Sequence, residues 1–348
     1  MAYAAISKPS LHFDTRLYTG AGSNLTVSDL GFQPDWAWFK KRNGSAGHEL
    51  YDALRGVQVY LASNSNNGND TNTNGLTAFN SGGWTVGGNG LATSGNWASW
   101  NWKANGQGSS NTSGSINSTY TSANTTAGFS IVTYTGNGSA GATIGHGLGA
   151  KPDCMLVKQL TGSNVSWRVY LGSDANYALE LNNTSAEAND NSIWNDTEPT
   201  STVFTVGSST STNGNGVNYV AYLFTSIKGY SKFDKYTGNA STNGPMINTG
   251  FKPAWVMMKN VGSTGNWWMF DNKRQATYNT VYNELLANST DTEDSAGSAS
   301  LDFLSNGIKI RTTQSDINGN GGTFAYMCFA ESPFVANVGA DGVPTTAR

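Results

Sequence analysis

Residues 134–158 read Tyr-Thr-Gly-Asn-Gly-Ser-Ala-Gly-Ala-Thr-Ile-Gly-His-Gly-Leu-Gly-Ala-Lys-Pro-Asp-Cys-Met-Leu-Val-Lys. The pattern is Tyr-Thr-Gly, a turn-rich stretch, Gly-x-x-Pro, and an apolar run ending in lysine six residues after the proline. It occurs twice more, starting at Tyr18 and at Tyr236. The matched positions are Gly20, Pro34 and Lys40, then Gly136, Pro152 and Lys158, then Gly238, Pro253 and Lys259. A spacing of roughly 100 residues is too long for a solenoid unit and indicates three domain-sized tandem repeats.

The apolar run after each proline predicts a strand that is buried on both faces. The runs cover 36–39, 154–157 and 255–258, and none alternates apolar with polar residues. Proline fixes φ at the entrance of such a strand without removing a central hydrogen bond. More short strand-like segments follow in each copy, and helical periodicity is almost absent. The predicted fold class is all-β, with three tandem β-sandwich or jelly-roll-like repeats.

The repeats and the composition between them predict the domain organisation. The segment 105–126 is small and polar, which indicates a linker, although Ile116 and Tyr120 indicate that part of it packs on a neighbour. The second and third repeats adjoin directly, which predicts a tighter interface between them. The predicted parts are an N-terminal arm (1–14), repeat one (15–104), the linker (105–126), repeat two (127–228), repeat three (229–334) and a C-terminal tail (335–348).

Polarity in this chain comes from amides and hydroxyls rather than from charge. Charged residues make up 12% of the 348 residues, and the formal net charge is −3. An aromatic content of 11%, with 11 Trp, argues against disorder. No lysine or arginine cluster forms the basic stripe that neutralises phosphates, so we expect no nucleic-acid partner.

The N-terminal residues lack the basic region and apolar core of a signal peptide. No apolar run approaches the roughly 20 residues that span a bilayer. We therefore expect synthesis in the cytoplasm and no membrane insertion. Cys154 and Cys328 both lie in apolar, strand-like runs, which predicts buried free thiols rather than a disulfide or a metal pair.

No set of residues in the sequence forms a recognisable catalytic or cofactor site. His12, His48 and His146 occupy places that do not match between repeats, and no Gly-x-Ser-x-Gly elbow is present. Residues 136–141 match Gly-x-Gly-x-x-Gly, but the glycine-rich residues 142–149 cannot supply the helix that a dinucleotide site needs. We interpret this stretch as a hairpin loop, and we expect no cofactor.

Asp35 and Asp153 occupy matched positions directly after the motif proline. Two carboxylates in one groove can hydrolyse glycosides, whereas an Asp after a turn proline commonly bonds nearby backbone. The third repeat has Ala254 at this position, which favours the backbone role. We therefore predict no catalytic residue and no metal site, and we expect that the protein is not an enzyme.

Two tryptophans are the candidate ligand-binding residues. Trp84 and Trp194 have polar neighbours in the sequence, and an indole ring can stack on a sugar. We interpret the three motif lysines as the ends of buried strands, with stems on apolar surface and ammonium groups in water; a binding role is the alternative. The acidic segment 291–294 lacks EF-hand spacing, and either holds calcium or is simply solvated.

The pattern of 134–158, followed by Tyr219-Val220-Ala221-Tyr222-Leu223-Phe224, resembles a repeated domain of tailed bacteriophages. This domain is frequent among phages of marine bacteria, cyanophages included, in virion structural and tail-fibre-like proteins. Residues 329–334 and 343–348 are similar to the C-termini of such proteins, and residues 9–20 resemble their entry segment. The resemblance covers nearly the whole chain. The motif's Asn is Ala21 in repeat one and its Asp is lost in repeat three, which argues against a function that needs three identical sites.

The resemblance implies a virion component on the particle surface. We expect a tail fibre or tail-associated receptor-binding protein that contacts the host by multivalent, non-covalent binding, because weak sites gain strongly when several act together. A head fibre or capsid decoration protein is the alternative, and an enzyme that degrades surface polysaccharide is the third hypothesis. The expected partners are other virion proteins of the tail or capsid, and a host cell-surface glycan or receptor. We expect a homo-oligomer such as a trimer, although three repeats would also let one chain imitate a trimer.

Overall fold

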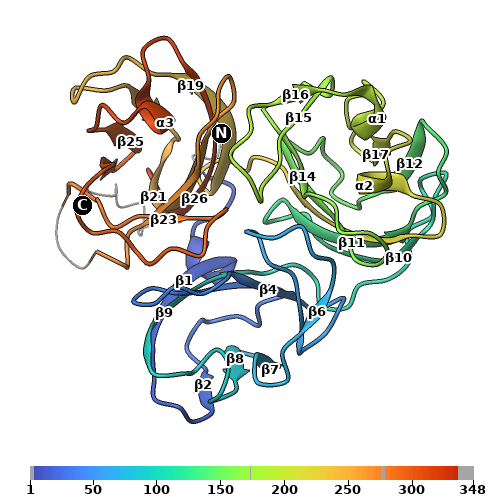
Figure 1. Ribbon diagram of the computed structural model, residues 1–348, viewed down its shortest axis with the longest axis horizontal. Coiled ribbons are helices and arrows are strands. Elements are labelled where there is room, and N and C mark those ends of the chain that lie inside the picture. The colour runs from blue at the N-terminus through green and yellow to red at the C-terminus, as the bar shows by residue number, and fades with distance from the viewer. Residues whose placement is uncertain (1–3, 173, 276–278, 336–348) are drawn as a thin grey trace.

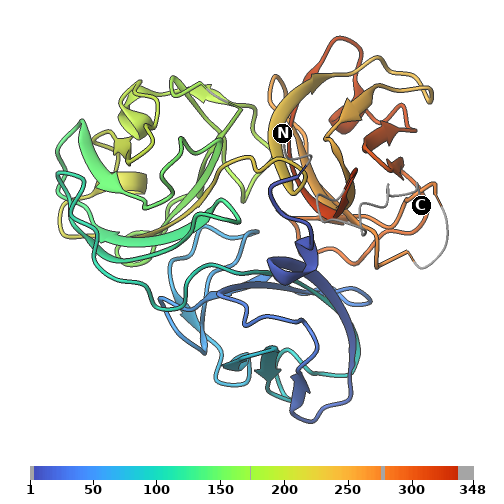
Figure 2. The ribbon, with the colours of Figure 1, turned by 180° about the vertical axis from the view of Figure 1, so that it is seen from behind.

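The computed structural model describes residues 4–172, 174–275 and 279–335. Three lobes surround a common centre and follow one another along the chain, from blue through green to orange (Figure 1). Figure 2 shows the same arrangement from behind. Antiparallel sheets form nearly all of the regular structure, and the α-helices in the described ranges are single turns of four residues. The chain is therefore all-β, as the sequence predicts.

The first lobe packs a four-stranded sheet against a three-stranded sheet, which makes it β-sandwich-like. The large sheet has the order β1-β9-β3-β4, and the small sheet has the order β2-β8-β7. A short 3-10 helix precedes them, and a ribbon of β5 and β6 lies at one side. The bounds are η1 (Pro9–Leu11), β1 (Phe13–Gly20), β2 (Leu25–Val27), β3 (Trp36–Lys41), β4 (Glu49–Asp52), β5 (Val59–Tyr60), β6 (Asp70–Thr71), β7 (Leu76–Asn80), β8 (Gly83–Val86) and β9 (Gly95–Trp102).

The second lobe has a five-stranded sheet of order β10-β11-β18-β13-β14. The small sheet pairs β12 with β17, and a separate ribbon pairs β15 with β16. The bounds are β10 (Ser118–Asn124), β11 (Phe129–Thr135), β12 (Ala142–Gly145), β13 (Cys154–Gln159), β14 (Arg168–Leu171), β15 (Tyr177–Ala178), β16 (Ala188–Asn189), α1 (Asn191–Trp194), β17 (Val203–Val206), α2 (Thr210–Asn213) and β18 (Asn218–Phe224).

The third lobe has a five-stranded sheet of order β19-β26-β21-β22-β23 and a three-stranded sheet of order β20-β25-β24. The bounds are β19 (Ser231–Thr237), β20 (Met246–Asn248), β21 (Phe251–Asn260), β22 (Trp267–Asp271), β23 (Leu285–Leu286), β24 (Leu301–Leu304), β25 (Gly307–Ile310), α3 (Ser315–Asn318) and β26 (Thr323–Pro333).

The three large sheets share one strand order. In each, the strand that carries Tyr-Thr pairs with the last strand of the lobe. The last strand pairs with the strand that holds the apolar run after the motif proline, and that strand pairs with the next one along the chain. Strand β10 adds to one edge of the second sheet, and it comes from the segment 105–126 that the sequence presents as a linker. This part of the segment therefore belongs to a sheet, because its backbone pairs with β11. Ile116, just before the strand, is buried, whereas Tyr120 within it is exposed.

The N-terminal arm is also packed rather than free over its described part. Ile6 is buried, and the amide of Ala5 donates to the carbonyl oxygen of Lys228 at 2.9 Å. Because Lys228 lies where the second lobe passes into the third, the arm is held at that junction.

The strand after the motif proline is buried on both faces, as its apolar run predicts. In β3, Ala37 and Phe39 face the interior of the first lobe, whereas Trp36 and Trp38 face the centre of the molecule. Strands β13 and β21 alternate in the same way between their own lobe and the centre. Burial of the second face arises because the three lobes pack on one another.

The largest hydrophobic cluster lies at this centre and takes residues from all three lobes. The rings of Trp36 and Tyr222 lie 4.6 Å apart across the first and second lobes. Those of Trp102 and Phe329 lie 5.6 Å apart across the first and third, and those of Phe224 and Phe329 lie 5.7 Å apart across the second and third. Aromatic side chains bury large apolar areas, so this cluster joins the lobes into one body.

The motif glycines are places of close backbone approach. A Cβ atom on Gly20, Gly136 or Gly238 would lie 2.2, 2.5 or 2.4 Å from a backbone carbonyl oxygen of the same lobe. No side chain fits there, so these positions require glycine whatever their φ. The glycine of Gly-x-x-Pro is required for its backbone conformation. Gly149, for example, has a φ of 73°, in the left-handed region that favours glycine.

Candidate functional site

The three motif lysines are fully buried, and each ammonium group reaches across to a neighbouring lobe. The contacts are Lys158 Nζ to the carbonyl oxygen of Asn66 at 2.8 Å, Lys259 Nζ to that of Thr184 at 3.2 Å, and Lys40 Nζ to that of Thr290 at 3.1 Å. Each Nζ also donates to a carbonyl oxygen of its own lobe. The expectation that these ammonium groups lie in water is wrong, because backbone carbonyls take the place of water. Burial lowers the pKa of each lysine to about 8.

The lysine contacts run in one direction around the molecule, from the second lobe to the first, from the third to the second, and from the first to the third. Three side chains at the start of the next strand follow the same direction. His48 Nε2 donates to the carbonyl oxygen of Leu286 at 3.1 Å. Trp167 Nε1 donates to the carbonyl oxygen of Ala62, and Trp267 Nε1 to that of Glu180, both at 2.9 Å. The lobes are therefore joined by polar contacts of matched direction as well as by the central core.

Two of the three interfaces also contain a buried aspartate that faces a neighbouring lobe. Asp52 forms an ion pair of 2.5 Å with Arg55 and accepts a hydrogen bond of 2.6 Å from the hydroxyl of Tyr222. Asp271 forms an ion pair with Arg274 of the same lobe and accepts a hydrogen bond of 3.1 Å from the indole of Trp100. Removing one member of a buried ion pair leaves an uncompensated charge, so these pairs fix how the lobes meet.

The carbonyls that the lysines bind belong to three corresponding loops, which we call the rim loops: residues 64–70, 182–187 and 288–294. Each rim loop follows a short strand of its lobe. The first residue of each loop is an asparagine whose Oδ1 accepts the backbone N–H of the residue at the start of the neighbouring strand, with distances of 2.8, 2.9 and 2.8 Å for Asn64, Asn182 and Asn288. One lobe therefore supplies the loop, and the next lobe holds it through lysine.

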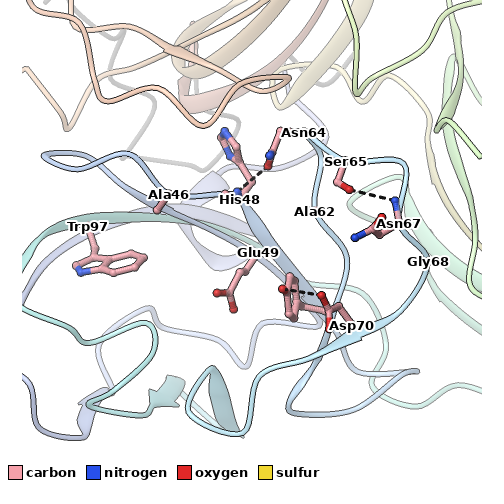
Figure 3. A pocket seen from close by; sticks show the side chains of 12 residues that line it. Ala46, His48, Glu49, Ala62, Asn64, Ser65, Asn67, Gly68, Asp70 and Trp97 are labelled. Atoms are coloured by element: carbon pink, nitrogen blue, oxygen red, sulfur yellow. Dashed lines mark hydrogen bonds between the residues drawn. The ribbon is translucent and has the colours of Figure 1, made fainter. Parts of the chain in front are cut away.

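The rim loop of the first lobe forms one wall of a pocket of about 260 Å³. Glu49 lies between Trp97 and Asp70 in this pocket (Figure 3). The carboxylate of Glu49 accepts hydrogen bonds from Asn72 Nδ2 at 3.1 and 3.2 Å, and burial raises its pKa. Asp70 accepts a bond of 3.1 Å from Tyr60 and is exposed, so the pocket opens to solvent.

The rim loop of the third lobe borders a second pocket, of about 500 Å³. Trp268 follows Trp267 in sequence as Glu49 follows His48, so Trp268 and Glu49 occupy corresponding places. Glu284 corresponds in the same way to Tyr60, because each precedes a leucine that pairs with the matching strand, Leu61 with β4 and Leu285 with β22. At these two places the first pocket has Glu49 and Tyr60, and the second has Trp268 and Glu284. Both pockets thus combine one carboxylate with one aromatic ring, but the two residue types have exchanged places. Burial raises the pKa of Glu284 to about 7.

An ion pair occupies the corresponding place in the second lobe. Arg168 matches Glu49 and Trp268, and its guanidinium lies 2.5 Å from the carboxylate of Glu180. Arg168 Nε also donates to Ser211 Oγ at 3.1 Å. The second lobe therefore has an ion pair at the place where the first lobe has Glu49 and the third has Trp268.

The structure places Trp84 and Trp194 away from these pockets. Trp84 lies in β8, Trp194 ends α1, and both are fully buried in the cores of their lobes. Trp84 Nε1 donates to Asn101 Oδ1 at 3.1 Å. Neither indole offers a ring face to a ligand, because polar neighbours in sequence do not report which way a strand or a helical turn directs a side chain.

The matched aspartates act on the backbone, as the missing carboxylate of the third repeat suggests. Asp35 Oδ2 accepts the N–H of Ala104 and Asp153 Oδ2 accepts that of Ser226, both at 2.7 Å. Each bond fixes the chain just after the last strand of its lobe, and the two carboxylates lie in different lobes. The two cysteines are free and buried, which confirms the prediction made for them.

Sequence reasoning did not find the two pockets. Most of their polar side chains come from segments with no motif, although Asp291 and Asp294 of the second pocket belong to the acidic segment 291–294 that the sequence singles out. The pockets arise where the rim loops fold back on the sheets. In the described ranges, no group of three His, Cys, Asp or Glu side chains could hold a metal ion. No helix in the same ranges is long and apolar enough to cross a membrane.

The fold defines an all-β protein of β-sandwich-like lobes. The chain belongs to the family described as "Domain of unknown function (DUF7483)", whose model matches residues 8–333. This match runs from η1 to the end of β26, so the unit that defines the family includes all three lobes. No curated protein and no solved structure matches the chain.

Proposed function

We propose that the three lobes are tandem copies of one β-sandwich unit, from which a single chain builds a closed, three-lobed body. The shared motif, the shared strand order and the lysine contacts that run in one direction support this. Contacts of one kind running in one direction are what a cyclic trimer of identical subunits has. Under this hypothesis one chain with three lobes takes the place of a trimer of single-lobe chains.

We further propose that this body is a bacteriophage virion protein, either a tail fibre or a tail-associated receptor-binding protein. Its resemblance to tail-fibre-like proteins supports this assignment. The observation that carries it is a pair of polar pockets at corresponding places on one body. Such a body can make several weak, non-covalent contacts with a host surface at once, and linking weak sites raises avidity well above the affinity of either one.

Immunogold electron microscopy of the virion, with antibody against this chain, tests the proposal. Gold at the tail supports host contact. Gold scattered over the head instead supports a head fibre or capsid decoration protein, and particles without label overturn a virion role altogether. The C-terminal tail lies outside the described residues from 336 onward, so its use as an anchor stays a prediction. A chain that ends at residue 335 tests it through incorporation into particles.

A further inference from the structure

We propose that the pockets of the first and third lobes each bind one uncharged sugar residue of a glycan, and that the Arg168–Glu180 ion pair closes the corresponding place in the second lobe. This inference rests on the proposed function and names its ligand class. It predicts two sugar sites on a chain with three lobes.

The chemistry of the pocket walls favours a sugar. A sugar ring presents hydroxyls that both donate and accept, together with an apolar face of C–H groups. In the first pocket Glu49 and Asp70 supply acceptors, Asn64 Nδ2 has no partner among the described residues, and Trp97 supplies an apolar surface. A volume of about 260 Å³ is just below the roughly 300–1,000 Å³ of sites for drug-sized ligands, which suits a single sugar residue.

The second pocket has the same mixture from different residues. Trp268 supplies the indole, Asn266 supplies an amide, and Glu284 and Asp316 supply carboxyl oxygens. Trp268 Nε1 donates to Asp316 Oδ2 at 3.3 Å, which fixes the indole against the pocket wall. Two pockets of unlike sequence and like chemistry, at corresponding places, point to the same class of ligand.

The charge of the walls selects against acidic sugars. Both pockets hold carboxylates, and no lysine or arginine is among their lining residues. The ammonium group of Lys41 lies 5.8 Å from the centre of the Trp97 ring, and the carboxylates of Glu49 and Asp70 outnumber it. A uronic acid or a sulfated or phosphorylated sugar would place a negative charge beside these carboxylates, and juxtaposed like charges suppress binding. An uncharged sugar avoids this repulsion and keeps the acceptors for its hydroxyls.

The motif lysines are positioning residues for these pockets. Lys158 of the second lobe holds the rim loop of the first pocket through Asn66, and Lys40 of the first lobe holds the rim loop of the third-lobe pocket through Thr290. Lys259 makes the same kind of contact with the rim loop of the closed place. The three lysines therefore form a matched set in which only two act on an open pocket.

Two indole groups report on the two pockets separately. Full-length protein labelled with 15N at tryptophan is titrated with methyl glycosides of glucose, galactose and mannose, with N-acetylglucosamine, and with methyl glucuronide. We expect at least one uncharged sugar to shift the indole signals of Trp97 and Trp268 and to leave that of Trp84 in place. The glucuronide should shift neither. No response of Trp97 and Trp268 to any uncharged sugar at about 100 mM, well above a millimolar Kd, overturns the proposal, and so does equal binding of the glucuronide.

Three matched variants then test the positioning role. Lys158→Met should raise Kd about tenfold at the Trp97 site alone, and Lys40→Met at the Trp268 site alone, because each loses about one hydrogen bond's worth of loop support. Lys259→Met removes the same kind of contact and should leave both Kd values unchanged, so it controls for general loss of stability. Equal effects of all three variants on both sites overturn the positioning role. Failure of sugar binding with gold label at the tail refutes this inference and leaves the virion assignment standing.

Discussion

His48 makes the contact between the first and third lobes sensitive to acid. Its Nδ1 accepts a hydrogen bond of 2.8 Å from Trp38 Nε1, so the proton of the neutral ring lies on Nε2 and is donated to the carbonyl oxygen of Leu286. Burial, with smaller contributions from the charges of Lys40 and Arg274, lowers the pKa of His48 to about 3. A second proton would need Nδ1, which already faces the N–H of Trp38.

The direction of the pH effect follows from the two pKa values. The unfolded chain takes up a proton at His48 near pH 6.5, whereas the folded protein does so only near pH 3. Stability from the neutral ring is therefore fully present above pH 6.5 and is lost as pH falls toward 3. The free energy of unfolding should lose about 2 kcal/mol from this residue between pH 8 and pH 5, since each pH unit below 6.5 contributes about 1.4 kcal/mol.

The assay compares the wild type with His48→Gln, in which an amide can still accept from Trp38 and donate to Leu286 but does not titrate. Guanidinium unfolding followed by tryptophan fluorescence gives the free energy of unfolding of both proteins at pH 8 and pH 5. The wild type should lose about 2 kcal/mol more than the variant over this interval. His12 and His146 are present in both proteins, so their contributions cancel. Equal losses in the two proteins would refute the assignment of acid sensitivity to His48.

Three further outcomes follow from the packing. Gly136→Ala should destabilise by about 2 kcal/mol or more because its Cβ would meet a backbone oxygen at 2.5 Å, whereas Gly262→Ala, with open space around it, should be neutral in thermal unfolding. Lys158→Met should destabilise the protein by about 2 kcal/mol, because two hydrogen bonds to carbonyl oxygens are lost. Lys151→Met on the surface should change stability by less than about 1 kcal/mol. Similar shifts of the denaturation midpoint in both variants would contradict this. Both buried thiols should resist a thiol reagent in the native protein and react in denaturant, and rapid native labelling would show that they are accessible.

Much of the local structure could be predicted from the sequence because its causes are local. The run at 154–157 predicts a strand without an exposed face, and β13 is buried along its whole length. Asp35 and Asp153, which follow the motif proline, accept hydrogen bonds from backbone N–H groups. This agrees with the prediction made from the third repeat, which has Ala254 at this position. The segment 105–126 shows the limit of this reasoning, since its polar composition hides a strand that a neighbouring sheet stabilises.

The candidate site could not be predicted because its parts are distant in sequence. Trp84 and Trp194 have polar neighbours but point into lobe cores, and side-chain direction depends on which face of an element packs. The pockets depend on rim loops that lysines of other lobes hold in place. The lysine contacts join residues 250, 92 and 75 positions apart, and no local pattern encodes such a pairing.

The sequence by itself determined the all-β class, the recurring motif, the doubly buried strands and the buried free cysteines, since periodicity, proline and glycine act over a few neighbouring residues. The tertiary structure decided what covers the second face of each motif strand, where each lysine finds its acceptor, and which side chains line the pockets of the first and third lobes. The physical reason is that the lobes bury those faces against one another. A buried ammonium group must then find carbonyl oxygens wherever the fold brings them, and here the fold brings them from the next lobe.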